Sequence, residues 1–245
     1  MRLRGKAALV TGGARGLGRA ICLAFARHGA KVAFTYAKNE EAAASLSAEL
    51  EALGQPHRAA KLSVLDGKGT EALVKELDAA WGGLDVLVNN AGITQNLPMA
   101  LLEEEDWDKV MDTNVKGTFL TTKAVLRFMI RKKAGVILNV GSLAGERMIE
   151  APVHYCTSKA ALRGFTEALA KEVSRHGIRA VNLAPGLLED GVGRNLPDYR
   201  LADYLKHCAL GRVGTFDEIA ELAALLASDE ARYMSGATVI ADGGV

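Results

Sequence analysis

The segment KAALVTGGARGLGRAICLAFARH, residues 6–28, joins a short apolar run, a glycine-rich turn and a stretch with helical spacing. Strand, turn and helix in this order present backbone N–H groups and the positive end of a helix to a phosphate. Gly12, Gly16 and Gly18 stand where the backbone must turn tightly or touch such a ligand. Glycines also serve ordinary tight turns, so the flanking strand and helix are what favour a dinucleotide site.

The composition of the 245-residue chain is that of a soluble globular protein, with 49% hydrophobic and 24% charged residues. A formal net charge of +1 gives no basic surface for nucleic acid. Three scattered cysteines without a CxxC motif argue against a disulfide framework or a zinc site. No apolar run approaches membrane-spanning length, and the first residues enter a strand rather than a signal sequence. We therefore expect one cytoplasmic domain, residues 1–245, that binds no nucleic acid, membrane or metal.

Apolar strands and amphipathic helices alternate along the chain. This alternation predicts an α/β fold, a doubly wound parallel sheet of about seven strands with helices on both faces. Strands are predicted at 6–11, 31–35, 59–64, 86–88, 135–140, 178–184 and 238–241, and helices at 19–28, 40–53, 70–81, 103–133, 153–176 and 218–226. Since ligands bind at the carboxyl ends of such strands, the glycine turn, Asn89-Asn90-Ala91-Gly92 and Ser142 should share one edge.

Tyr155 and Lys159 are four residues apart in the helix predicted at 153–176, so they share one helix face. A nearby ammonium favours the phenolate and lowers the pKa of a phenol, which would let the pair transfer a proton near neutral pH. Such a pair also occurs by chance in many helices. Asn114 lies inside the helical stretch 103–133, where an amide without a partner is unfavourable. It is therefore either a site residue or the mark of a local break near Thr113-Asn114.

The second strand runs out into Tyr36-Ala37-Lys38-Asn39, with no carboxylate before Glu40. A carboxylate at this position would grip the hydroxyls of an unphosphorylated ribose and repel a 2′-phosphate. Its absence, together with Arg15 and Lys38, favours a phosphorylated ribose, although either base can also be a solvated surface charge.

Residues 187–209 interrupt the alternation, with Gly191, Gly193, Pro197 and two tyrosines among apolar residues. A long insertion at the ligand edge is typical of a lid over the substrate, which we predict here.

Taken in order, the motifs resemble those of the short-chain dehydrogenase/reductase family over essentially the whole chain, which implies a single-domain Rossmann-type fold. The matching motifs are Thr11-Gly12-x-x-x-Gly16-x-Gly18, Asn89-Asn90-Ala91-Gly92, Asn114, Ser142, Tyr155-x-x-x-Lys159 and Pro185-Gly186. Within the family the chain is most similar to 3-oxoacyl-[acyl-carrier-protein] reductases, as Ile93-Thr94 and Leu210-Gly211-Arg212-Val213-Gly214 indicate.

The resemblance implies roles for four catalytic residues. Tyr155 would donate a proton to the ketone oxygen while NADPH delivers hydride, and Lys159 would lower the pKa of Tyr155 and hold the nicotinamide ribose. Ser142 would hydrogen-bond the substrate oxygen, and Asn114 would anchor a water molecule in a proton relay.

The resemblance also implies NADP(H) as the cofactor, with Arg15 on the 2′-phosphate and Pro185-Gly186 beside the nicotinamide. The implied cofactor-binding residues are Gly12, Arg15, Gly16, Leu17, Gly18, Tyr36, Asn90, Ala91, Gly92, Tyr155, Lys159, Pro185 and Gly186. One departure is Ser63, which stands where many members carry an aspartate that contacts the adenine.

As partners, the resemblance implies a homotetramer and an acyl carrier protein that docks near the mouth of the site on Arg131, Lys132, Lys133 and Lys171. The first three basic residues would equally suit the negative end of a helix. Two other functions stay open. One is a ketoreductase or alcohol dehydrogenase for a polyketide, a sugar or another small carbonyl compound. The other is a non-catalytic nucleotide-binding subunit, which is disfavoured because Asn114, Ser142, Tyr155 and Lys159 are all present.

Overall fold

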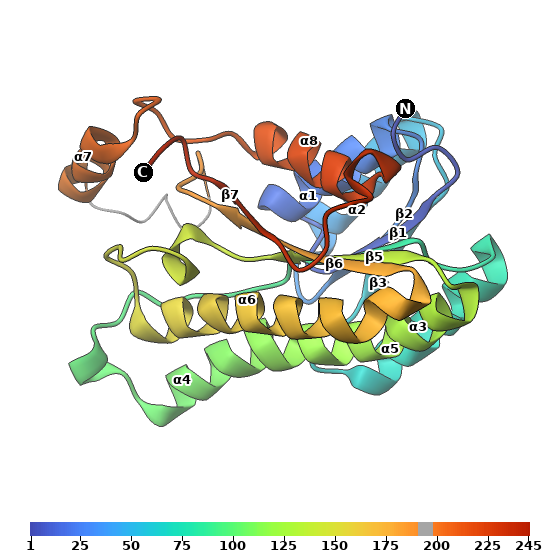
Figure 1. Cartoon of the computed structure of the whole chain (residues 1–245), viewed down its shortest axis with the longest axis horizontal. Helices are drawn as coiled ribbons and strands as arrows, with labels where there is room; N and C mark the ends of the chain where they lie inside the picture. The colour runs from blue at the N-terminus through green and yellow to red at the C-terminus, as the bar shows by residue number, and fades with distance from the viewer. Residues whose placement is uncertain (191–197) are drawn as a thin grey trace.

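The computed structural model describes residues 1–190 and 198–245. Its parallel strands form one seven-stranded sheet in the order β3-β2-β1-β4-β5-β6-β7 (Figure 1). The strands are β1 (Ala7–Val10), β2 (Lys31–Tyr36), β3 (His57–Lys61), β4 (Val86–Asn89), β5 (Gly135–Val140), β6 (Ile178–Pro185) and β7 (Thr238–Ala241). The predicted doubly wound, Rossmann-type parallel sheet is therefore confirmed, and the strand order reverses between β1 and β4.

Helices cover both faces of the sheet (Figure 1). On one face lie α1 (Gly16–Arg27), α2 (Glu40–Ala52) and α8 (Phe216–Ala227), and on the other lie α3 (Gly67–Trp81), α5 (Gly117–Lys132) and α6 (Val153–Val173). The other longer helices are α4 (Glu104–Met111), before α5, and α7 (Asp198–His207), which lies at one end of the molecule beside the C-terminus. Single turns stand at η1 (Met99–Leu101), η3 (Leu143–Gly145), η4 (Ser174–His176) and η6 (Asp229–Ala231).

The central strand β1 shows why the sheet is rigid. All four of its residues are buried. Ala8 and Val10 pack into the core beneath α1 and α8, whereas Leu9 packs into the core formed with α3, α5 and α6. A parallel strand with both faces covered reads as a continuous apolar run, which is the pattern that the sequence shows. The buried strands therefore hold the positions of the segments that follow their carboxyl ends.

The helical stretch predicted at 103–133 is divided by a π-helical turn, η2 (Asp112–Lys116), between α4 and α5. The predicted break near Asn114 is thus confirmed, and Asn114 lies inside it. The strand predicted at 59–64 instead spans His57–Lys61. Val64 leaves the sheet and packs against Gly117, where an added Cβ would lie 2.6 Å from Val64 Cγ2.

The predicted lid at 187–209 contains α7, while its residues 191–197 lie outside the described residues. Among the helices that the structure describes, none combines the length and the apolar character needed to cross a membrane.

Candidate active site

The glycine turn between β1 and α1 has the geometry of a surface that a ligand approaches closely. Gly12 and Gly16 have φ values of +64° and +54°, in the left-handed region that favours glycine. A Cβ on Gly18 would overlap the carbonyl oxygen of Gly12 and lie 2.5 Å from Asn90 Nδ2. The turn therefore requires these glycines, and the residues present fit a pyrophosphate that rests on exposed backbone at the start of α1.

Asn90, which follows the neighbouring strand β4, braces this turn together with Thr11 at the head of the turn. Asn90 Nδ2 donates to the carbonyl oxygens of Thr11 and Gly12 at 3.0 and 3.1 Å. Thr11 Oγ1 accepts the backbone N–H groups of Asn90 and Ala91, both at 3.0 Å. The side chain of Asn90, a predicted cofactor-binding residue, is thus used to hold the turn. Thr11 was not among the predicted site residues, although its place at the head of the glycine motif was an available signal.

The end of β2 is the predicted adenosine side of the site. Arg15 is exposed at the residue before α1, and Tyr36 is the half-buried last residue of β2. Glu40 forms an ion pair with Lys61, and this hydrogen bond lowers the pKa of the Glu40 carboxyl group. The nearest acidic residue after β2 is therefore paired with a base from β3.

Ser63 and Asp66 both serve the chain's own turn before α3. Ser63 Oγ accepts the N–H of Leu65 at 3.2 Å, and Asp66 Oδ1 accepts the N–H of Gly69 at 2.9 Å. Asp66 thus caps α3. It does not replace the aspartate that many family members carry at the position of Ser63.

Tyr155, Lys159 and Ser142 come together where α6 begins beside the end of β5. Tyr155 makes a hydrogen bond with Ser142. The Nζ of Lys159 lies 5.7 Å from the centroid of the Tyr155 ring and donates to the carbonyl oxygen of Val140 at 2.7 Å. Lys159 is only 5% exposed. The predicted catalytic pair therefore shares one face of α6 with the predicted oxygen-binding serine opposite it.

The electrostatic balance of this pair differs from the expectation. Burial raises the pKa of the Tyr155 phenol, and the hydrogen bond with Ser142 opposes that shift only in part. Burial also lowers the pKa of Lys159 to about 8. In the chain alone, desolvation outweighs the attraction between phenolate and ammonium, because both groups are enclosed and Lys159 is turned toward the Val140 carbonyl.

Asn114 is 1% exposed and binds two segments at once. Its Oδ1 accepts the N–H of Ile93 at 2.8 Å, while its Nδ2 donates to the Ile93 carbonyl at 3.0 Å and to Ser158 Oγ at 2.9 Å. Ser158 Oγ in turn donates to the Tyr155 carbonyl at 2.8 Å. Ser158 thus links Asn114 to the catalytic helix, a role that was missed although the residue stands directly before Lys159.

Three further predicted residues are Ala91, Gly92 and Leu17. A Cβ on Gly12 would lie 3.0 Å from Ala91 Cα, and one on Gly92 would lie 3.5 Å from Lys159 Nζ. Leu17 is partly buried against the core beneath α1. The structure therefore brings the glycine turn, the 89–92 segment and Lys159 to the same edge of the sheet.

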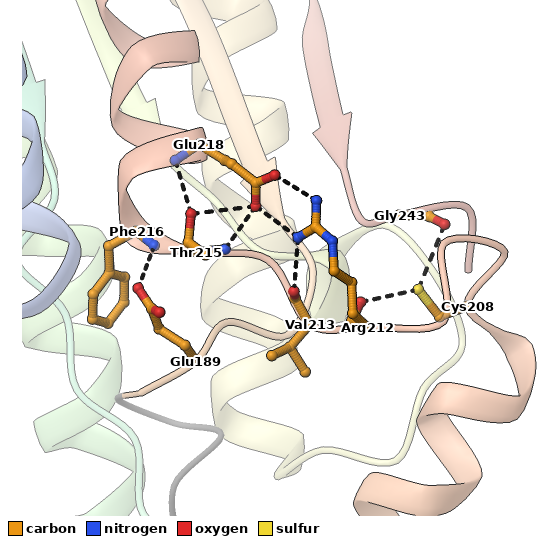
Figure 2. Close-up of polar contacts among 8 residues, drawn as sticks. All are labelled: Glu189, Cys208, Arg212, Val213, Thr215, Phe216, Glu218 and Gly243. Carbon is orange, nitrogen blue, oxygen red and sulfur yellow. Dashed lines mark hydrogen bonds and ion pairs between the residues drawn. The ribbon is translucent and has the colours of Figure 1, made fainter.

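The turn after β6 and the loop before α8 complete this edge. The Gly186 N–H donates to the carbonyl oxygen of Ala241 at 2.9 Å. Figure 2 shows that the Phe216 N–H donates to Glu189, at 2.9 Å, and that the Arg212 guanidinium pairs with Glu218. A Cβ on Gly16 would lie 3.8 Å from the Phe216 ring, so α8 begins against the glycine turn.

The predicted carrier-docking residues lie elsewhere. Arg131 and Lys132 pair with Asp78 and Asp85, each at 2.7 Å, and Asp85 directly precedes β4 at the amino edge of the sheet. Lys133 ends α5 at the same edge, and Lys171 follows Tyr155 by about 24 Å along the axis of α6. Within one chain these bases therefore lie away from Tyr155, because α5 and α6 run from the site to the far edge, and docking at them stays a prediction.

A family model described as short chain dehydrogenase matches residues 6–199. The chain therefore belongs to the short-chain dehydrogenase/reductase family, and it is an oxidoreductase that acts on CH–OH groups with a nicotinamide cofactor. It is 40% identical over 245 residues to the 3-oxoacyl-[acyl-carrier-protein] reductase FabG of Escherichia coli (strain K12), covering 100% of this chain and 99% of that one. It is 37% identical over 240 residues to FabG of Staphylococcus aureus (strain Mu50), covering 98% of each chain.

Among solved structures, a short chain dehydrogenase from Burkholderia cenocepacia J2315 in complex with NADP superimposes with a TM-score of 0.92. It is 34% identical and covers 100% of this chain and 99% of its own.

Proposed function

We propose that the protein catalyses the NADPH-dependent reduction of a 3-oxoacyl thioester, carried by an acyl carrier protein, to the 3-hydroxyacyl form. The grouping of Ser142, Tyr155 and Lys159 beside the braced glycine turn carries this proposal. The full-length similarity to two FabG reductases supports the substrate class.

Bound at the glycine turn, NADPH would supply the hydride that reduces the carbonyl carbon. Ser142 holds the carbonyl oxygen, and Tyr155 donates the proton that turns this oxygen into a hydroxyl. Lys159, whose pKa is about 8, keeps its charge at neutral pH. Its ammonium, 5.7 Å from the centroid of the Tyr155 ring, would then stabilise the phenolate that forms when Tyr155 gives up its proton.

We assign Asn114 a bracing role more than a water-binding one. An asparagine side chain offers two donors and two acceptor positions, and protein groups occupy three of these four in Asn114. Through Ser158, these contacts fix the turn of α6 that carries Tyr155.

Selection of NADPH over NADH is proposed to rest on Arg15. Arg15 is exposed at the start of α1 beside the end of β2, where a 2′-phosphate would lie. The nearest acidic residue after β2, Glu40, pairs with Lys61, and the NADP complex of the Burkholderia relative supports the same choice.

A carrier that docks on Arg131, Lys132, Lys133 or Lys171 would have to extend its acyl group about 24 Å along α6 or enter the site of a neighbouring copy. We therefore propose docking at these residues only together with the expected homotetramer.

The substrate class is tested with a panel that contains a short 3-oxoacyl thioester, the same 3-oxoacyl chain on acyl carrier protein, and small ketones of polyketide and sugar type. Mass spectrometry identifies the hydroxy product with NADPH in excess. The proposal expects the 3-hydroxyacyl thioester to form faster than any other alcohol. If only a small ketone were reduced, the proposed thioester substrate would be wrong, and the protein would be a reductase of another carbonyl compound.

A further inference from the structure

Helix α7 touches the turn after β6 through the side chain of Tyr204. The Tyr204 hydroxyl accepts the N–H of Leu187 at 2.9 Å and donates to the carbonyl oxygen of Asp242 at 3.4 Å. The side chain is half-buried, and burial raises the pKa of its phenol. Tyr204 therefore serves this contact as a neutral hydrogen-bonding group.

The Gly186 and Leu187 turn is held from three directions. Backbone groups supply two contacts, from the Gly186 N–H to Ala241 and from the Gly214 N–H to the Leu187 carbonyl at 3.0 Å. The Tyr204 hydroxyl supplies the third. A Cβ on Gly186 would lie 2.5 Å from this hydroxyl and 2.8 Å from Asp242 Cα. Glycine is thus needed for the turn to meet both the hydroxyl and the segment after β7.

The two ends of α7 are attached in different ways. Near its start, Arg200 pairs with Glu150, which lies between Ser142 and Tyr155 in sequence and has a 71% exposed side chain. An ion pair whose carboxylate is largely exposed to solvent contributes little. Four residues later, Tyr204 binds part-buried backbone groups. The position of the turn therefore depends on Tyr204 far more than on Arg200.

We propose that Tyr204 is a positioning residue, which fixes the Gly186 and Leu187 turn as the wall that the nicotinamide ring rests against. The inference rests on the proposed function and on the place beside the nicotinamide that the family resemblance implies for Pro185 and Gly186. Without the hydroxyl, the Leu187 N–H loses its partner and the wall loses its tie to α7. The nicotinamide half of NADPH would then bind less firmly, while the adenosine half, held at the glycine turn and Arg15, would be unaffected.

The test compares Tyr204→Phe with the wild-type chain in binding titrations of NADPH and of adenosine 2′,5′-bisphosphate, which lacks the nicotinamide. Tyr199→Phe is the matched control, because it removes a hydroxyl from the same helix at a 68% exposed residue that interacts with Arg200 and so tests the other attachment of α7. We expect Tyr204→Phe to weaken NADPH binding about fivefold to tenfold, the effect of one unsatisfied N–H. Binding of the bisphosphate should stay within about twofold, and Tyr199→Phe should change neither.

Retained binding of the bisphosphate also shows that the variant is folded. Unchanged NADPH binding in Tyr204→Phe would overturn the inference, and so would an equal loss of both ligands, since that is the result of a general structural defect. A wild-type chain that binds the bisphosphate but not NADPH would instead contradict the proposed function.

Discussion

The glycine turn and the wall formed by Gly186, Leu187 and α7 border the same edge of the sheet, but they are held differently. The glycine turn is fixed by Asn90 and Thr11, from adjacent buried strands. The wall is fixed by two backbone hydrogen bonds at Gly186 and Leu187, and it is tied to α7 through the Tyr204 hydroxyl. The start of α7 is held by the pair of Arg200 with the exposed Glu150. The side that positions the catalytic groups is therefore strongly constrained, whereas the α7 side depends on a few contacts, and substitutions on the two sides should have different consequences.

The largest effect is expected at the constrained side. Tyr155→Phe should lower kcat by about 10³-fold, because it removes the proposed proton donor while keeping the ring. NADPH affinity should stay within about threefold, since the glycine turn and Arg15 are untouched. Steady-state kinetics and a binding titration measure the two quantities. A tenfold or smaller fall in kcat would show that Tyr155 is not the proton donor.

Lys159 should make the free energy of unfolding depend on pH. Burial lowers the pKa of Lys159 from its ordinary value of 10.5 to about 8 in the folded chain, so between these values the unfolded chain binds a proton that the folded chain has released. Stability should therefore rise with pH across this window, by at most about 3 kcal/mol. Lys159→Met should lack the rise.

Urea unfolding of wild type and Lys159→Met at several pH values between about 7 and 10.5 measures the difference between the two curves. Other titrating groups cancel in that difference. Parallel curves would show that burial does not depress the pKa of Lys159.

Two glycines test how closely the turn is packed. Gly18→Ala should cost about 1–3 kcal/mol of stability, because the new methyl overlaps the Gly12 carbonyl and approaches Asn90. Gly164→Ala, in α6 with open space around its Cβ position, should instead stabilise by about 0.5–1 kcal/mol. Denaturant unfolding measures both, and equal effects would contradict the packing argument.

A smaller effect is expected at Arg15. Arg15→Gln should weaken NADPH binding about tenfold and leave NADH binding within about twofold, since only NADPH carries the 2′-phosphate. Lys38→Gln is the control, expected to change NADPH binding less than threefold. A parallel loss for both cofactors would assign Arg15 to the shared pyrophosphate instead.

The smallest effect is expected on the α7 side. Glu150→Gln should change the stability by less than about 1 kcal/mol and the KM for a ketone by less than about threefold. Thermal unfolding and steady-state kinetics measure these values. A loss as large as that of Gly18→Ala would erase the contrast between the two sides.

The glycine turn and the catalytic residues could be predicted from the sequence because short motifs encode their geometry. Residue type and spacing predict a turn at Gly12, Gly16 and Gly18. They also predict a shared helix face for Tyr155 and Lys159. The apolar runs predict the parallel sheet that brings these two features together. The use of Asn90 as a brace was not predictable, since its partners are backbone atoms of a strand about 80 residues away.

The contacts of α7 could not be predicted from the sequence. Tyr204 is one of two tyrosines in a segment without periodicity, and only the folded chain places it 2.9 Å from the Leu187 N–H. The sign of the shift in the pKa of Tyr155 was also missed, because spacing shows proximity to Lys159 but not the burial of both groups.

The central claim is that this edge of the sheet reduces a 3-oxoacyl thioester with NADPH. The most direct measurement is the loss of nicotinamide absorbance when wild-type protein meets a short 3-oxoacyl thioester, with NADPH and NADH in parallel. The account predicts steady consumption of NADPH that exceeds that of NADH by about tenfold or more. No consumption of either cofactor, in a protein that still binds NADPH, would contradict it.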